Sequence, residues 1–163
     1  MNEEEFISFV KKNYEEKIDI KSQKFGQLQI NNRKLEIVEF QDCDFANCKV
    51  VSSDLKKVIF ADTKFINCDF SNTCFDGATF IRCKFDNCKC VGGDFMESRI
   101  YNCLVKNSIF DYANFTNASL EKDKFIENNM KNTIFQEVKF KNTQYSKCNL
   151  TRSSVFQNNA KRN

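Results

Sequence analysis

The 163-residue sequence has no histidine, no proline and no tryptophan, and only 4 glycines. Without histidine there is no imidazole to act as a general base, to activate a serine or cysteine nucleophile, or to ligate a metal. The glycines are too few and too scattered to form a phosphate-cradling loop. These absences exclude the commonest catalytic and nucleotide-binding motifs. We therefore expect a non-catalytic protein with no cofactor and no metal site.

A large excess of charge of one sign is also missing. Lys and Arg number 25 against 22 Asp and Glu, which gives a net charge of +3. Direct nucleic-acid binding is not expected, because the basic stripe that neutralises phosphates is absent. No apolar run is long enough to span a membrane, and the first twenty residues are acidic where a signal peptide is basic. We expect a cytoplasmic protein with no membrane contact.

The chain has instead 18 phenylalanines and 9 cysteines, and the phenylalanines follow a strict period. From Ile20 to Val155, every fifth residue is large and apolar or aromatic, with Cys90 as the exception. Small residues recur two positions before these centres, from Val38 onward. No insertion or deletion shifts the register, so the repeat governs nearly the whole chain.

A period of five fits neither a helix nor one long strand. Successive centres would be 140° apart on a helix, since each residue turns about 100°, and they would alternate faces on a strand. A short strand followed by a corner returns each centre to the interior, and four corners close a square coil of about 20 residues. Residues 20–159 then form about seven coils, stacked about 4.8 Å apart into a rod of about 34 Å.

Asparagine and glycine recur at the expected corners, where they tolerate positive φ. Residues 20 apart stack, so one such set is expected to form an exposed ladder. This set contains Asn47, Asn67, Asn87 and Asn107. The absence of proline is consistent with backbone N–H groups that are committed to hydrogen bonds between coils.

Stretches such as Cys43-Asp44-Phe45-Ala46-Asn47 and Cys68-Asp69-Phe70-Ser71-Asn72 carry a family resemblance. The chain resembles the pentapeptide-repeat family over residues 20–157. The resemblance implies an all-β solenoid, a right-handed quadrilateral β-helix. Some members mimic DNA and protect type II topoisomerases such as DNA gyrase from quinolones or toxins. This chain departs from them, because its coils are net basic, uninterrupted, and followed by a short polar tail (158–163).

Residues 1–19 are expected to form a capping helix over the first coil. Asn2 and Glu5 have the spacing of a capping box. An apolar stripe at helical spacing contains Phe6, Phe9, Val10 and Tyr14. At the other end no such lid is expected. An open last coil exposes strand edges, so we expect an end-to-end homodimer through Leu150, Val155 and Phe156.

The cysteines allow two interpretations. Clustered thiols could form a soft-metal or redox site. Alternatively, cysteine fills the small inward position as a buried hydrophobe, the interpretation that we favour. The residues in that position are Cys43, Cys48, Cys68, Cys83, Cys88, Cys103 and Cys148.

Asp123 and Asn128 break the inward pattern, because they stand where small residues belong. A buried carboxylate needs a partner. Either the wall bulges locally, which we favour, or Asp123 accepts hydrogen bonds from backbone N–H groups.

The outward positions are the remaining source of function. Stacking places Ile59, Ala61, Ile81 and Tyr101 near one another, and such a patch can mark a contact site. β-Propensity of Ile and Tyr explains these residues equally well. We expect a scaffold that acts through contacts with a protein partner, whose identity the sequence does not give, and topoisomerase protection is the alternative.

Overall fold

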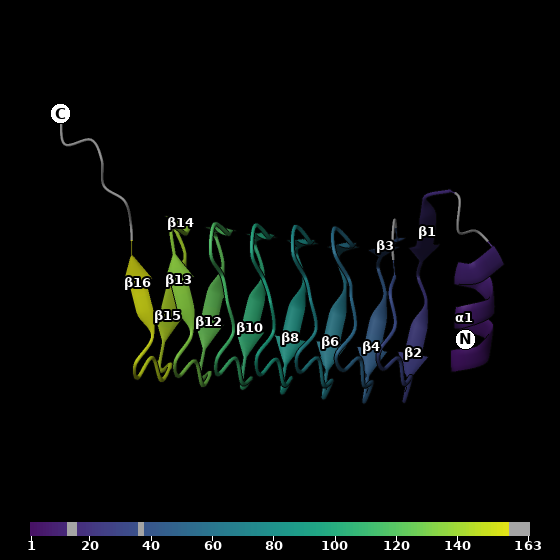
Figure 1. Ribbon diagram of the computed structural model, residues 1–163, viewed down its shortest axis with the longest axis horizontal. Coiled ribbons are helices and arrows are strands. Elements are labelled where there is room, and N and C mark those ends of the chain that lie inside the picture. The colour runs from purple at the N-terminus through teal and green to yellow at the C-terminus, as the bar shows by residue number, and fades with distance from the viewer. Residues whose placement is uncertain (13–15, 36–37, 157–163) are drawn as a thin grey trace.

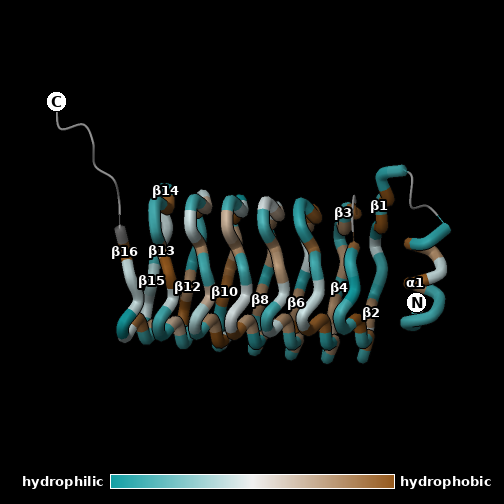
Figure 2. Tube along the Cα trace, in the orientation of Figure 1, coloured by the Kyte–Doolittle hydropathy of each residue, from teal (hydrophilic) through white to brown (hydrophobic). Residues whose placement is uncertain are grey.

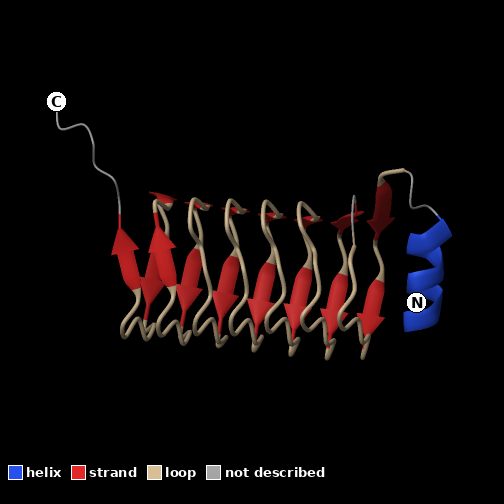
Figure 3. Ribbon diagram, in the orientation of Figure 1, coloured by secondary structure: helices blue, strands red, loops and turns tan. Residues whose placement is uncertain are grey.

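The computed structural model describes residues 1–12, 16–35 and 38–156. The chain is a β-solenoid of about seven turns with one helix, α1 (Glu3–Lys12), at its N-terminal end (Figure 1). The short strands of successive coils lie side by side along the rod, which runs horizontally in Figure 3. The fold class predicted from the five-residue period is confirmed.

Parallel ladders form the four sides of the solenoid. The first sheet contains, in pairing order, β1 (Ile18–Lys21), β3 (Val38–Gln41), β5 (Ile59–Ala61), β7 (Thr79–Ile81), β9 (Arg99–Tyr101), β11 (Ser119–Glu121) and β14 (Lys139–Lys141). The second sheet contains β2 (Lys24–Gly26), β4 (Asp44–Ala46), β6 (Lys64–Ile66), β8 (Lys84–Asp86), β10 (Leu104–Lys106), β12 (Lys124–Ile126) and β15 (Gln144–Ser146). Single bridges build the other two sides, where β13 (Ile134–Gln136) and β16 (Ser154–Phe156) also pair.

The register between coils is a constant 20 residues. Phe40 pairs with Phe60, and Phe60 pairs with Phe80. Corner residues join the same network, since the Asn47 N–H donates to the Ile66 carbonyl at 3.0 Å. A proline within these ladders would remove a donor, which explains why none occurs.

Each corner holds a residue with positive φ. Described corner residues from Ser22 to Arg152 have φ between 50° and 67°. Although asparagine and glycine tolerate this conformation best, Lys57 and Tyr112 adopt it as well. The hydrogen bonds between coils therefore impose the corner geometry even on residues that do not favour it.

The predicted asparagine ladder is present over three coils. The Asn67 side chain donates to Asn47 Oδ1 at 3.3 Å, and Asn87 donates to Asn67 Oδ1 at 2.8 Å. The prediction is wrong for Asn107, which donates instead to Asp86 Oδ1 at 3.2 Å. A carboxylate is the stronger acceptor, so the ladder ends there.

Phenylalanine rings fill the interior in stacked columns. Phe60 lies between Phe40 and Phe80, with ring centroids 5.1 and 5.3 Å away and nearly parallel planes. Rings of adjacent sides meet edge to face, as Phe60 and Phe65 do at 5.1 Å. Figure 2 shows the resulting alternation of hydrophobic and hydrophilic residues around each coil.

Helix α1 covers part of the first coil. Its capping box is confirmed: the Asn2 N–H donates to Glu5 Oε2 and the Glu5 N–H to Asn2 Oδ1, both at 2.9 Å. Phe6 is fully buried, and its ring centroid lies 5.7 Å from that of Phe25. Phe9 is 37% exposed, so the buried stripe is narrower than predicted. Tyr14 and the polar tail 158–163 lie outside the described residues.

The phenylalanine columns predict that two neighbouring residues of strand β6 contribute very differently to the free energy of unfolding. Phe65→Ala removes a ring that stacks on Phe45 and Phe85. It should lower the free energy of unfolding by about 3–5 kcal/mol, measured by urea denaturation. Ile66→Ala is the matched control, since Ile66 points outward and is 38% exposed. Equal losses for the two variants would contradict the assigned interior.

Candidate interaction surfaces

The cysteines occupy the interior wall. Of the 9, only Cys74 and Cys148 are partly exposed, and all are free thiols. The buried thiols donate to backbone carbonyl groups, as Cys83 Sγ does to the Phe60 oxygen at 3.3 Å. Burial raises the pKa of the Cys43 and Cys90 thiols. Within the described residues, no group of three or more His, Cys, Asp or Glu could hold a metal ion. These contacts support the structural interpretation of the cysteines.

Asp123 is fully buried without a bulge in the wall. The register runs unbroken through β11 and β12, and Asp123 Oδ1 accepts the Cys103 N–H at 2.7 Å. The favoured prediction of a local bulge is therefore wrong, and the alternative of a hydrogen bond from the backbone is confirmed. The register holds because the backbone bonds of neighbouring coils fix it, so the carboxyl side chain must fit the small position.

Asn128 shows how an amide fits the equivalent position on the next side. Its Oδ1 accepts the Ser108 N–H and its Nδ2 donates to the Val105 carbonyl, both at 2.9 Å. Asp123 repeats the acceptor half of this arrangement, but its Oδ2 has no hydrogen-bond partner in the described part of the chain. Burial raises the pKa of Asp123 to about 7.

Two further buried oxygen atoms near the C-terminal coil have no partner among the described residues, Thr143 Oγ1 and Tyr145 Oη. The ring of Tyr145 stacks on Phe125 at 4.9 Å. Burial is the main cause that raises the pKa of Tyr145, and the charge of Asp123 adds to it. This end of the interior is therefore more polar than the rest.

The predicted apolar patch lies on the outer face of the first sheet. Ala61, Ile81 and Tyr101 are register neighbours in one column, and Ile59 lies two residues from Ala61 on β5. All four side chains are partly or largely buried by their neighbours. Tyr101 also contacts Lys122, whose Nζ lies 5.3 Å from the ring centroid.

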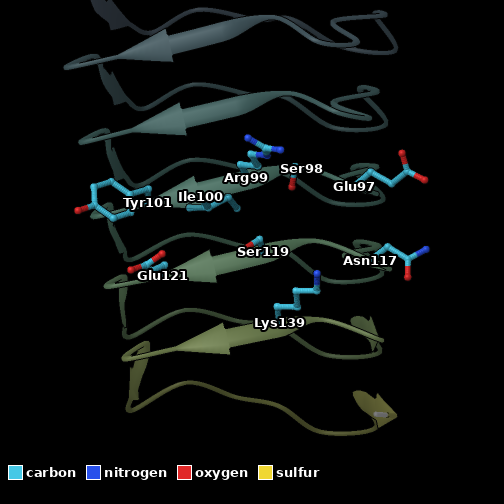
Figure 4. Close-up of a pocket in the computed structure, with 9 residues that line it drawn as sticks. All are labelled: Glu97, Ser98, Arg99, Ile100, Tyr101, Asn117, Ser119, Glu121 and Lys139. Carbon is cyan, nitrogen blue, oxygen red and sulfur yellow. The ribbon is translucent and has the colours of Figure 1, made fainter. Parts of the chain in front are cut away.

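A groove of about 590 Å³ adjoins this patch (Figure 4). Ser119 forms its floor, and Arg99 and Lys139 lie on the coils before and after it. Glu97 and Asn117 line one end, whereas Tyr101 and Glu121 line the other. The groove exists because one short side chain stands between two long ones. The groove was not predicted from the sequence, although aligning outward residues at a spacing of 20 places Arg99, Ser119 and Lys139 in one column.

The last coil has partly exposed centres. Leu150 is 40% and Val155 is 59% exposed, whereas Met130 and Phe135 one coil earlier are buried. The structure does not describe the side chain of Phe156, the third residue of the predicted dimer end. The dimer stays a prediction.

Across the described part of the chain, no helix is both long and apolar enough to cross a membrane.

A rod of stacked four-sided coils with a packed interior is a β-solenoid repeat protein, which offers partners its faces and its ends. The chain belongs to the pentapeptide repeat family, since the family model described as "Pentapeptide repeat region" matches residues 38–114 and 78–155. It has no match among curated protein sequences.

Solved structures that share the fold include two described below. One is HetL, a pentapeptide repeat protein involved in heterocyst differentiation regulation from the cyanobacterium Nostoc sp., at 10% identity and a TM-score of 0.58, with 94% of each chain covered. The other is trypsin-treated QnrB1, a plasmid-mediated fluoroquinolone resistance protein, at 14% identity and a TM-score of 0.51. The alignment covers 85% of this chain and 84% of the QnrB1 chain. At such identities the likeness shows the fold alone.

Asp123 predicts an unusual pH dependence of stability. Its folded pKa is raised from 3.8 to about 7, so the native state binds the proton more tightly than the unfolded state. Its contribution to stability is therefore lost as pH rises from about 4 through 7. Asp123→Asn should remove this loss and raise the free energy of unfolding at pH 8 by about 1–3 kcal/mol.

The matched control is Asn128→Asp, which places a carboxyl group in the equivalent position and loses the bond to the Val105 carbonyl. This variant should be destabilised, and more so at pH 8 than at pH 5. Urea denaturation at both pH values measures the two effects. If the difference in stability between each variant and the wild type were the same at both pH values, the assignment would be contradicted.

Proposed function

We propose that this protein is a non-catalytic scaffold that binds a protein partner on the outer face of its first sheet. The observation that carries the proposal is the column of Ala61, Ile81 and Tyr101, which runs over three coils in register. An apolar column bordered by charged side chains has the composition of a protein contact surface. The partner would meet a rigid surface, because backbone hydrogen bonds and stacked rings hold each coil in place.

The chemistry of the chain supports a role without catalysis. Its acidic and basic side chains form ion pairs along the faces, as Arg82 and Asp62 do at 2.6 Å. The absence of histidine removes the commonest general base. The proposal places the protein in the cytoplasm, where free thiols stay reduced.

A second candidate is protection of a type II topoisomerase, which the fold shared with QnrB1 favours. Mimicry of DNA requires a strongly acidic surface, whereas this chain has a net charge of +3. A gyrase supercoiling assay with ciprofloxacin tests this candidate. Restored supercoiling would support it, and no effect at micromolar protein would end it.

An end-to-end homodimer through Leu150, Val155 and Phe156 is also proposed. The exposed centres Leu150 and Val155 support it, because burying them against a second copy removes apolar surface from water. Among the described residues strand β16 pairs with β13 alone, so its other edge can accept a further strand.

The proposed face predicts a selective loss of binding. Ile81→Glu places a charge in the apolar column and should abolish recovery of the partner when tagged protein is incubated with an extract of its native cell and analysed by mass spectrometry. Ile66→Glu is the matched control, because Ile66 holds the equivalent outward position on the second sheet. Equal recovery with both variants would place the contact elsewhere.

A further inference from the structure

The first-sheet face, which comprises the outward side chains of the first sheet and the corner residue that follows each of its strands, is divided by charge. Its first coils carry acidic residues, namely Asp19, Glu39, Asp42 and Asp62, beside the single base Lys21. Its later coils carry basic residues, namely Arg82, Arg99, Lys122, Lys139 and Lys141, beside the single acid Glu121. The apolar column lies between the two halves. The face therefore has an acidic end, an apolar middle and a basic end.

We propose that the first-sheet face binds a second copy of this chain, with the two rods antiparallel. The proposal rests on the proposed function and names its partner. The two-fold axis lies between the two faces and runs parallel to strand β7. A residue on a coil before β7 therefore faces the second copy's residue at the same position along the strand, on the coil that is equally far after β7. Such an isologous contact is the commonest symmetry of protein dimers.

This symmetry brings opposite charges together. Asp19 faces Lys139 of the second copy, and Asp42 faces Lys122. The corner that precedes each strand has the reverse polarity, and there Lys57 faces Glu97. Because both columns are complementary in the antiparallel arrangement, electrostatic attraction between the copies favours it.

The apolar middle is self-complementary in size. Ile81 lies on the axis and faces its own copy, whereas the small Ala61 faces the large Tyr101. Ile59 faces the stem of Arg99, whose methylene groups can cover it. These contacts remove apolar surface from water at the centre of the interface, where it contributes most.

The groove over Ser119 receives a specific side chain in this arrangement. The residue opposite Ser119 is Glu39 of the second copy, since each lies two coils from β7. Its carboxylate would enter between Arg99 and Lys139, the two cations that border the groove (Figure 4). In the single chain Glu39 pairs with Lys17 at 2.5 Å, so the dimer adds two further cations to this acid.

Two contacts oppose the dimer and limit its strength. Lys21 faces Lys141 at the rim, which places like charges together. Arg82 lies on the axis and faces its own copy, although in each chain Arg82 already donates hydrogen bonds to Asp62 of the same chain at 2.6 and 2.8 Å. The face is about 30 Å long and about 15 Å wide, or about 450 Å² per copy. This is smaller than the area of about 800 Å² per partner in a standard interface. We expect a weak dimer that loosens as salt increases.

Charge-reversed variants of the full chain test the arrangement by sedimentation velocity. Glu39→Arg repels Arg99 and Lys139 of the second copy, and Arg99→Glu repels Glu39 of the second copy. Lys139 is left unchanged in both variants, because it also faces Asp19. Each should weaken self-association at least about tenfold. An equimolar mixture should restore the dimer, since the two reversed charges then face each other. Restoration also shows that both variants are folded.

The control for the end-to-end alternative is Val155→Asp, which leaves the first-sheet face unchanged. It should not weaken the antiparallel dimer. A monomeric wild-type chain at low salt, a mixture that fails to associate, or dissociation caused by Val155→Asp would each overturn the proposal. If the chain is monomeric but Ile81→Glu still abolishes recovery of a partner from extract, the inference fails while the proposed function stands. If Ile81→Glu and Ile66→Glu behave alike, the proposed function fails as well.

Discussion

The constant register of 20 residues between coils is the constraint on which this structure depends. Backbone groups of one coil bond to the next, as the Lys84 N–H does to the Thr63 carbonyl at 3.0 Å. A slip of one residue in the pairing between coils would exchange the inward and outward faces of the strand that slips. The same register stacks the rings into columns and forces corner residues such as Tyr112 into positive φ. The hydrogen bonds between coils therefore override the backbone conformations that individual residues prefer.

That constraint also explains the unusual composition. Phenylalanine fills the centre of each side, and a small residue two positions earlier leaves room for it. Cysteine meets the second requirement, because it is small and its thiol can donate to carbonyl groups of the wall, as in Cys83. Asp123 occupies the same kind of position because its carboxyl group accepts the Cys103 N–H, and burial raises the pKa of that carboxyl group.

A packed interior leaves function to the surface. Each outward column contains one residue from every coil, so side chains that are 20 residues apart in sequence form one continuous surface. On the first-sheet face this arrangement gives an acidic end, an apolar middle and a basic end, with the groove over Ser119 in the basic half. A face with this symmetry suits a partner of reversed polarity, and a second copy of the chain has that polarity.

The sequence by itself determined the fold, because a five-residue period fits neither a helix nor one long strand, and it determined which residues lie inside. It also placed Ile59, Ala61, Ile81 and Tyr101 on one face. The tertiary structure decided how irregular residues are accommodated: it showed Asp123 bonded to the Cys103 N–H in an unbroken wall, and Asn107 bonded to Asp86 rather than to the ladder. It also revealed the groove between Arg99 and Lys139, which depends on side-chain lengths across three coils. The period fixes the position of each side chain, whereas its hydrogen-bond partners and the hollows between neighbours depend on atoms that the chain brings together only when it folds.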